Sequence, residues 1–396
     1  MITTINNKHN KLNVPNLKDK GNGIRNVPNL RFPEFQGEWE KCKLGDYGKV
    51  VTGNTPPTKD IENYENGTYL WASPADLGRI KSISETKIML SAKGFSKTRA
   101  LPKGSVLVTC IGSTIGKTGM ATKEMSTNQQ INSIVVNDNS DNDFVYYAIQ
   151  SAFPRYLSSI AVQAVPIISK SAFELLPNQR PCLQEQKKIG KMLSLLDERI
   201  ATQNKIIDKL QSLIKGISNR IFASIQGIEY RMGDIVTITN GNSNVQDAVS
   251  QSKDGLYPFF DRSEDIKYLP TFLFDKEAII YPGEGTEFMP RYFKGKFALH
   301  QRCYAIFDFN EIINARFLYF YLKTRNSYFV KNAVGSTVPS LRLDTFQKLK
   351  VIIPSKKIQH SVSLCLSSME QKCNVEKKIL HKLLKQKQYL LRQMFI

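Results

Sequence analysis

The most regular hydrophobic pattern in the chain is a heptad repeat that occurs twice. Apolar side chains recur at alternating steps of four and three through residues 183–224, and the series returns 173 residues later within residues 356–396. A stripe of this period predicts two long helices that pack against each other. The first seam comprises Ile189, Leu193, Leu196, Ile200, Gln203, Ile207, Leu210, Ile214, Ile217 and Ile221, and the second Val362, Leu366, Met369, Cys373, Glu376, Leu380, Leu383, Leu390 and Met394.

The two seams match in phase, and both carry a polar residue at the same layer, Gln203 in the first and Glu376 in the second. An antiparallel pair is favoured because the first helix, about 50 Å long at ~1.5 Å per residue, carries the chain away and the second brings it back. Paired polar layers would fix the register of such a pair. Lys387 interrupts the second seam. The alternative, in which each helix packs only on its own globular part, explains the apolar stripe but not the matched phase.

The remaining hydrophobic runs are short and predict a mixed fold. "SVLVTC" and "INSIVV" in the first half, and "EAIIY" and "CYAIF" in the second, are β-branched or aromatic runs bounded by turn residues, which is typical of strands. "DFVYYAIQSAF" and "NARFLYFYLKTR" predict short helices. The predicted class is therefore α+β, with two globular α/β modules joined by the two long helices in a pseudo-two-fold arrangement.

The segments predicted to be globular also form an internal sequence repeat. "KLGDYGKVVTGNT" from Lys43 matches "RMGDIVTITNGNS" from Arg231, 188 residues later, and "GTYLWASPAD" matches "GLYPFFDRSE" at the same offset. Further on, Gln129 aligns with Gln301 and Pro166 with Pro339. The repeat predicts two related modules. The predicted segments are an N-terminal arm, partly disordered, at 1–40, a first module at 41–182, a first long helix at 183–224, a second module at 225–355 and a second long helix at 356–396.

The net charge indicates the class of partner. Fifty-five basic and 35 acidic side chains leave +20, an excess that favours a polyanion, with nucleic acid ahead of an anionic membrane surface. No apolar stretch approaches the roughly 20 residues that span a bilayer, and the polar start does not resemble a signal peptide. Six scattered cysteines without a Cys-x-x-Cys pair fit reduced thiols, and no metal site is predicted. We therefore expect a cytoplasmic protein.

"LQEQKKIGKMLSLLDERIATQNKIIDKLQSLIKGI", from Leu183, closely resembles the spacer-helix region of type I restriction-modification specificity subunits, and "VPNLRFPEFQGEWEKCKLGDYGKV", from Val27, resembles their entry segment. The resemblance implies a non-catalytic subunit with two target recognition domains, each reading one half of a bipartite double-stranded DNA target. It implies that the helices dock two adenine-methylating modification subunits and that two translocating restriction subunits join. The chain itself would bind no cofactor, whereas these partners would use S-adenosylmethionine, and ATP with Mg²⁺, respectively.

The second half departs from this pattern, because the Glu185–Gln186 pair and the run 197–199 have no full counterpart there. The two modules also differ in sequence, which predicts two different half-sites and an asymmetric target. Helices about 50 Å long would place the modules roughly 15 base pairs apart on B-form DNA.

Catalytic alternatives have weaker support. In "CIGSTIGKTGM" only three residues separate Gly112 from Gly116, one fewer than a phosphate-binding P-loop needs. A self-sufficient nuclease would use Asp76, Glu85 and Lys87, but such triplets arise often by chance. "NTPPT" lacks the Asn/Asp-Pro-Pro-aromatic pattern of an adenine methyltransferase. A coiled-coil scaffold that binds DNA without sequence preference would not need two related modules.

Candidate DNA contacts are polar loop residues able to present paired donors and acceptors to base edges, or charge to phosphates. For each of them a turn-forming or solvated surface role is equally compatible with the sequence. The candidates are Asn54, Thr55, Arg79, Lys81, Lys97, Arg99, Ser113, Thr114, Lys117 and Thr118 in the first module, and Asn242, Asn244, Gln246, Arg262, Arg291, Tyr292, Lys294 and Lys296 in the second.

Overall fold

The computed structural model describes residues 26–159 and 166–396, so the disorder predicted for residues 1–25 lies outside the described part. The chain forms two compact units, one comprising residues up to Asn204 together with Ile379–Ile396, and the other Lys205–Lys378. Both long helices are therefore divided between the units, whereas the repeat pattern treats them as segments of their own. Each unit has an α+β fold.

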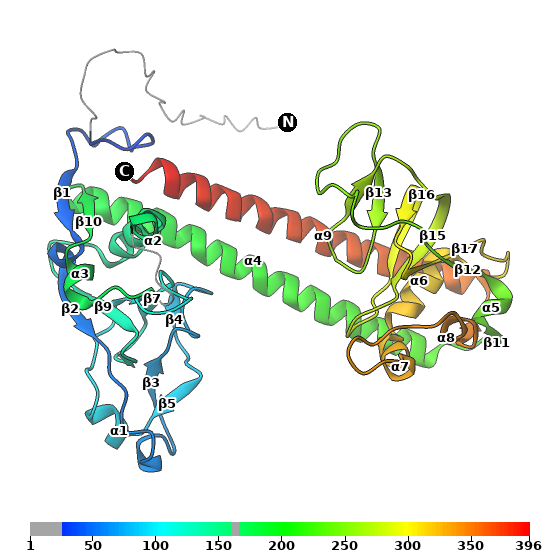
Figure 1. Ribbon diagram of the computed structural model, residues 1–396, viewed down its shortest axis with the longest axis horizontal. Coiled ribbons are helices and arrows are strands. Elements are labelled where there is room, and N and C mark those ends of the chain that lie inside the picture. Colours follow the sequence, from blue (N-terminus) through cyan, green and yellow to red (C-terminus); the bar gives the residue numbers. More distant parts are fainter. Residues whose placement is uncertain (1–25, 160–165) are drawn as a thin grey trace, which may run out of the picture. The chain divides into compact units, whose positions relative to one another are not determined.

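The first unit contains a five-stranded sheet of order β2-β9-β6-β7-β4, a three-stranded sheet of order β5-β3-β8 and a ribbon of β1 and β10 (Figure 1). The predicted strands "SVLVTC" and "INSIVV" correspond to β6 and β9. The strands are β1 (Glu40–Lys43), β2 (Gly48–Thr52), β3 (Tyr69–Ala72), β4 (Ser82–Ile83), β5 (Ile88–Leu90), β6 (Val106–Thr109), β7 (Thr118–Ala121), β8 (Ser126–Thr127), β9 (Ile131–Val136) and β10 (Pro177–Arg180). The helices are η1 (Leu44–Tyr47), η2 (Ile61–Asn63), α1 (Ala92–Ser96), α2 (Asn142–Ser159), α3 (Lys170–Glu174) and the first half of α4 (Leu183–Ser224).

The second unit repeats this plan with one six-stranded sheet of order β12-β17-β15-β16-β13-β14 and a ribbon of β11 and β18. Its β16 pairs antiparallel with β15, as β7 pairs with β6 in the first unit. The same strand also pairs parallel with β13, as β8 pairs with β3. The strands are β11 (Ile228–Arg231), β12 (Thr237–Asn240), β13 (Tyr257–Phe260), β14 (Lys267–Leu269), β15 (Phe274–Pro282), β16 (Arg291–Leu299), β17 (Cys303–Phe307) and β18 (Lys350–Ile353). The helices are α5 (Met232–Ile235), α6 (Ala315–Lys323), α7 (Asn326–Asn332), α8 (Leu343–Gln347) and the first part of α9 (Lys356–Gln393).

The long helices pack on their modules through matching contacts in the two units. Gln186 accepts a hydrogen bond from the Asp141 N–H at 3.1 Å and donates to the Pro181 carbonyl at 2.9 Å. Gln359 makes the same pair of contacts with the Asn314 N–H at 2.7 Å and the Pro354 carbonyl at 2.9 Å. Both glutamines thus tie a helix start to a module, whereas Ile358 stands at the position of Glu185, so the Glu185–Gln186 pair is matched only in part.

All predicted seam residues are buried or half-buried. In the first unit, Lys387 does not merely interrupt the seam, because its ammonium group pairs with the Asp197 carboxylate of α4 at 2.6 Å. The same carboxylate accepts a hydrogen bond from the Tyr147 hydroxyl at 2.7 Å. The lysine that broke the hydrophobic pattern therefore links α9, α4 and the module in one polar contact.

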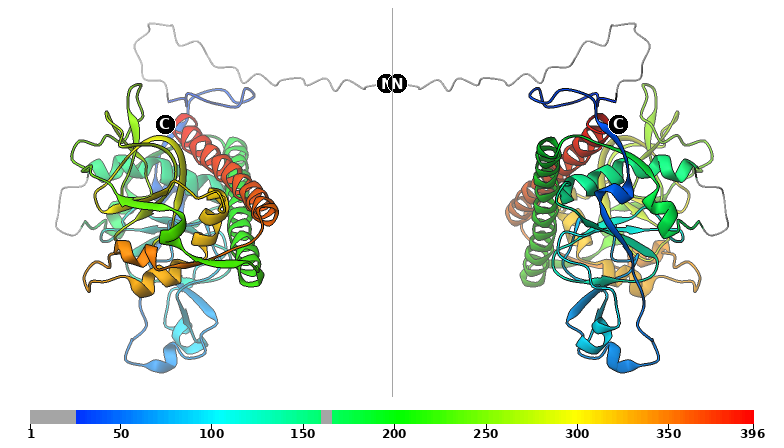
Figure 2. Two further views of the ribbon diagram at one scale, coloured as in Figure 1. Left: turned by 90° about the vertical axis from the view of Figure 1, so that its right-hand side faces the viewer. Right: turned by 90° about the vertical axis from the view of Figure 1, so that its left-hand side faces the viewer.

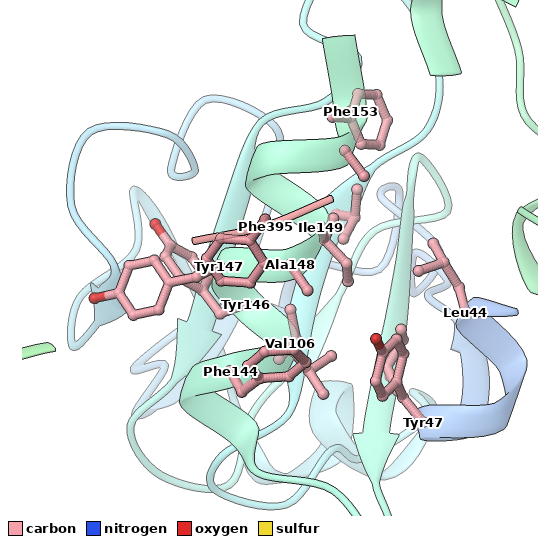
Figure 3. Close-up of a cluster of buried hydrophobic side chains, with 14 of the residues drawn as sticks. Leu44, Tyr47, Val106, Phe144, Tyr146, Tyr147, Ala148, Ile149, Phe153 and Phe395 are labelled. Atoms are coloured by element: carbon pink, nitrogen blue, oxygen red, sulfur yellow. The ribbon is translucent and has the colours of Figure 1, made fainter. Parts of the chain in front are cut away.

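Residues 26–39, part of the arm predicted at 1–40, pack against the first unit. The Leu30 N–H donates to the Gln393 carbonyl at 2.8 Å, so this segment lies beside the end of α9 (Figure 2). Phe395 packs against Trp39 and Phe144, with ring centroids 6.1 and 5.4 Å away, and Figure 3 shows Phe395 in the same cluster as Phe144. Phe222 packs on Phe317 in the second unit, so each long helix ends with a phenylalanine in a module core.

Candidate nucleic-acid interface

A short polar turn occupies the same position in both modules. Residues 128–130 follow β8, which runs parallel to β3, and residues 300–302 follow β16, which runs parallel to β13. We call these two segments the twin turns. The bridge of Ala72 to Thr127 matches that of Phe260 to Leu299, so Asn128 and His300 occupy equivalent positions. The sequence alignment of Gln129 with Gln301 agrees with this superposition.

A glycine lets a second segment come close to each turn. A Cβ atom on Gly53 would lie 2.2 Å from the Asn128 carbonyl oxygen, and one on Gly241 only 2.0 Å from the Leu299 carbonyl oxygen. Both distances are far below van der Waals contact, so only glycine fits at these positions. The repeated Gly-Asn pairs are thus explained by this close approach.

A third segment completes the arrangement. The Gly112 N–H donates to the Pro166 carbonyl at 3.0 Å, and the Gly285 N–H donates to the Pro339 carbonyl at 3.0 Å. Gly112 has φ of +88° and lies in the turn between the antiparallel strands β6 and β7, next to the Gln130 side chain. The glycine-rich stretch that imitates a P-loop is therefore a hairpin turn beside residues 128–130.

In the first module, hydrogen bonds orient the turn. The buried Asn128 side chain accepts from the Gln130 N–H at 3.0 Å and donates to the Gln130 side-chain oxygen at 3.1 Å. The Thr55 hydroxyl donates to the side-chain oxygen of the exposed Gln129. The Gln130 side chain is thus held by Asn128, whereas Gln129 is exposed.

In the second module, the turn borders an open polar pocket of about 520 Å³. The buried Asp261 carboxylate accepts hydrogen bonds from the Lys267 ammonium group at 2.7 Å and the Ser263 N–H at 2.8 Å. Burial raises the pKa of Asp261, but these hydrogen bonds outweigh it and leave the pKa below its ordinary value. The pocket is lined by Val245, Asp261, Arg262, Ser263, Lys267, Glu284, His300, Gln301, Arg302 and Cys303.

Arg302 is held in this pocket through both its backbone and its side chain. Its Nη1 donates to Glu284 Oε1 at 2.6 Å, and its backbone N–H donates to His300 Nδ1 at 3.2 Å. Burial lowers the pKa of His300, so the ring is neutral at pH 7, and with Nδ1 accepting, its proton lies on Nε2. The pocket therefore combines fixed cations, carboxylates and a neutral imidazole.

Several predicted DNA contacts are used inside the protein instead. Lys81 pairs with the Asp143 carboxylate at 2.5 Å and is only 10% exposed, and Thr118 is buried in β7. Both ends of the Asn54 side-chain amide make hydrogen bonds. Its nitrogen donates to the Lys97 carbonyl at 2.8 Å, and its oxygen accepts from the Arg99 N–H at 3.0 Å. These contacts inside the protein make a DNA contact less favourable at all three residues than the sequence indicated, because Asn54 is already hydrogen-bonded at both ends of its amide, Lys81 is ion-paired and Thr118 is buried.

In the second module, the half-exposed Arg291 and Tyr292 also make contacts inside the protein. Arg291 Nη2 donates to the Asp261 carbonyl at 3.0 Å, and the Tyr292 hydroxyl donates to Glu277 while its ring lies 3.6 Å from the Arg316 guanidinium. Lys97 pairs with Asp60 at 2.9 Å but is partly exposed. The other predicted residues are all exposed or half-exposed: Thr55, Arg79, Lys97, Arg99, Ser113, Thr114 and Lys117 in the first module, and Asn242, Asn244, Gln246, Arg262, Lys294 and Lys296 in the second.

Sequence reasoning missed Gln129, Gln301 and Arg302. The one available signal was the alignment of the two glutamines across the repeat, in a polar stretch directly after a predicted strand.

Of the residues considered for nuclease chemistry, Asp76 caps a local turn, because its carboxylate accepts from the Ser73 N–H at 2.8 Å and the Lys87 N–H at 3.0 Å. Among the described residues, no group of three or more His, Cys, Asp or Glu side chains is arranged to hold a metal ion.

No helix within residues 26–159 and 166–396 has both the length and the apolar character needed to cross a membrane. The exposed surface of the long helices nevertheless carries large hydrophobic side chains. On α4 these include Leu195 and Leu213, and on α9 they include Leu364, Val375, Leu384 and Tyr389.

Comparison with known proteins gives consistent results. The family described as the type I restriction modification DNA specificity domain matches residues 36–212 and 228–385. The type I restriction enzyme MjaIX specificity subunit of Methanocaldococcus jannaschii is 25% identical over 391 residues, which cover 87% of this chain and 89% of that protein. The EcoDI specificity subunit of Escherichia coli is 29% identical over 138 residues, 35% of this chain and 30% of that protein. The crystal structure of a type I restriction-modification S subunit from M. genitalium has the same fold, with a TM-score of 0.67 at 19% identity, covering 93% of this chain and 99% of that one.

Proposed function

Because this chain belongs to the family of type I restriction-modification DNA specificity subunits, we propose that each of its two modules reads one half of a bipartite, asymmetric DNA target. The observation that carries the proposal is the pair of twin turns. They have the same backbone setting in both modules but different side chains, Asn-Gln-Gln in one and His-Gln-Arg in the other. The same geometry with different chemistry is expected of two modules that read different base sequences.

The charge supports DNA as the ligand. The net charge of +20 provides the counterion-releasing contacts that give sequence-independent affinity for the DNA backbone. Residues 356–396 alone contain nine Lys or Arg and two Glu. Exposed lysines of the two modules, such as Lys117 and Lys294, are suited to phosphate contacts that position the protein without carrying sequence information.

We further propose that the long helices dock two modification subunits and that two restriction subunits complete the assembly. The exposed hydrophobic side chains on α4 and α9 support docking of partners, because isolated surface leucines are common but several along one helix favour a protein interface. In this proposal the chain is non-catalytic. Methylation would use S-adenosylmethionine bound by the modification subunits, and restriction would use ATP and Mg²⁺ bound by the restriction subunits.

The decisive experiment is methylome sequencing of a host that carries the cognate modification subunit, with and without this chain. We expect one bipartite asymmetric motif that contains methylated adenine and depends on the chain. Replacing residues 43–180 with the module of another specificity subunit should change one half of the motif only. The absence of a chain-dependent motif, or a change in both halves after the exchange, would contradict the proposal.

A further inference from the structure

We propose that the twin turns are the base-reading elements of the two modules, with Gln129 reading an adenine in the first half-site and Arg302 reading a guanine in the second. This inference rests on the proposed function and goes further, because it assigns specificity to particular side chains. It follows from the position of the turns, the hydrogen bonds that orient them and the pocket beside residues 300–302.

The two turns occupy equivalent positions in the folds of their modules, so their location is a feature of the fold. In each module, the turn lies beside the segment of the close-approach glycine, Gly53 or Gly241, and the segment that contains Gly112 or Gly285 donates to the carbonyl group of Pro166 or Pro339. In the second module the pocket beside the turn is lined by Val245, Glu284 and His300 from these segments, and also by residues 261–263 and Lys267. A site assembled from the same segments in two modules of different sequence is a conserved piece of architecture within one chain, which favours a shared role.

Gln129 has the hydrogen-bonding state needed to read adenine. The Thr55 hydroxyl donates to its side-chain oxygen and so holds the amide group in place. The second lone pair of that oxygen and both N–H groups remain available. An amide that offers one acceptor and one donor side by side matches N6 and N7 of adenine in the major groove.

Arg302 has the state needed to read guanine. Its side chain is 62% exposed, and Glu284 holds only Nη1, so Nε and Nη2 remain to donate to guanine N7 and O6. The corresponding residue in the first module, Gln130, is tied to Asn128 and is not free to do the same. The third residue of the turn therefore makes the two half-sites chemically different.

Gln301 is exposed beside Arg302, and within the described residues its side-chain amide makes no hydrogen bond to the protein. It can thus add a second base contact in the same module. The pocket contains no Phe, Tyr or Trp side chain on which an extruded base would stack. Its chemistry suits base edges in the groove rather than a flipped base.

The test uses the complex of this chain with its modification subunit, first in cells and then purified. Methylomes are compared for the wild type, Gln129→Ala, Arg302→Ala and Arg302→Lys. Lys331→Ala is the matched control, because it removes one exposed positive charge from α7 in the same unit as Arg302. The wild-type methylome tests the proposed function by itself, since a chain-dependent motif must be present before any variant is interpreted.

We expect both Arg302 variants to relax one guanine in a single half of the motif, and Gln129→Ala to relax one adenine in the other half. Arg302→Lys keeps the charge but loses the bidentate fork, so it should lose specificity as well. Lys331→Ala should leave the motif unchanged. Because each variant affects one half-site, the other half serves as an internal control for folding and assembly.

Binding titrations of the purified complexes on duplexes that carry each of the four bases, position by position, measure the discrimination directly. Loss of one bidentate contact should reduce the preference for guanine or adenine by roughly 5- to 150-fold. An unchanged preference in the Arg302 and Gln129 variants would overturn the proposal, even if overall affinity fell. Relaxation of both halves by one variant would overturn it too.

Discussion

The buried ion pair between Arg31 and Glu185 provides a quantitative test of how residues 26–39 hold the first unit together. Arg31 Nε and Nη2 donate to the two oxygens of Glu185 at 2.8 and 2.7 Å, and the Glu185 side chain is completely buried while that of Arg31 is 14% exposed. Arg31→Ala removes the cation and leaves a buried carboxylate without its ion-pair partner. Breaking a buried pair from one side costs about 3–5 kcal/mol, because the remaining charge loses its compensation.

Urea unfolding followed by tryptophan fluorescence measures this cost in the correct unit. The chain contains two tryptophans, Trp39 and Trp71, and both are buried in the first unit. The Arg31→Ala variant should show a lower midpoint with an unchanged slope. The matched control is Lys170→Ala, which breaks an exposed pair with Glu174 and should change the free energy of unfolding by less than about 1 kcal/mol.

A double variant separates loss of charge compensation from loss of packing. The position that corresponds to Glu185 in the second half is Ile358, so an apolar residue is compatible with a helix start of this kind. Arg31→Leu combined with Glu185→Ile should recover most of the stability lost in Arg31→Ala, because no buried charge remains. A loss below about 1 kcal/mol in Arg31→Ala would refute the reasoning, since it would mean that water reaches the Glu185 carboxylate.

Three further outcomes are expected. Burial raises the pKa of Asp141, so its ionised form is disfavoured in the folded state. The resulting loss of stability appears as pH rises through the unfolded-state pKa of this carboxyl group and is absent at lower pH. Asp141→Asn should therefore raise the urea midpoint at pH 7 but not near pH 3. Lys387→Ala should lower the free energy of unfolding of the first unit by about 2 kcal/mol in the same fluorescence assay, because Asp197 loses its cation. Equal urea midpoints for the variant and the wild type would show instead that the ion pair is solvated. Cys182 and Cys365 are exposed and should react promptly with a thiol reagent, whereas the other four cysteines are buried and should react only on unfolding, which a timed absorbance assay of released thiolate distinguishes.

The architecture could be predicted from sequence because the signals that specify it are local or repeated. Heptad spacing follows from the 3.6-residue helical turn, so the range 183–224 predicted for the first long helix coincides with α4, and the seam residues are buried or half-buried. Gly53 and Gly241 stood out as repeated glycines before the structure showed the carbonyl groups that exclude a Cβ atom. The family resemblance rested on the same helical region.

The details of the candidate interface depended on contacts between residues far apart in the chain. Lys81 and Thr118 had the right chemistry for DNA contacts, but the packing of α2 against the sheet placed them inside the protein. Arg302 was not singled out, because its setting requires Glu284, and nothing in the spacing of these two residues along the chain indicates that they will meet. A side chain's periodicity decides which face of an element it occupies, whereas only the tertiary packing decides which faces meet, which polar atoms are already satisfied and which remain free to bind.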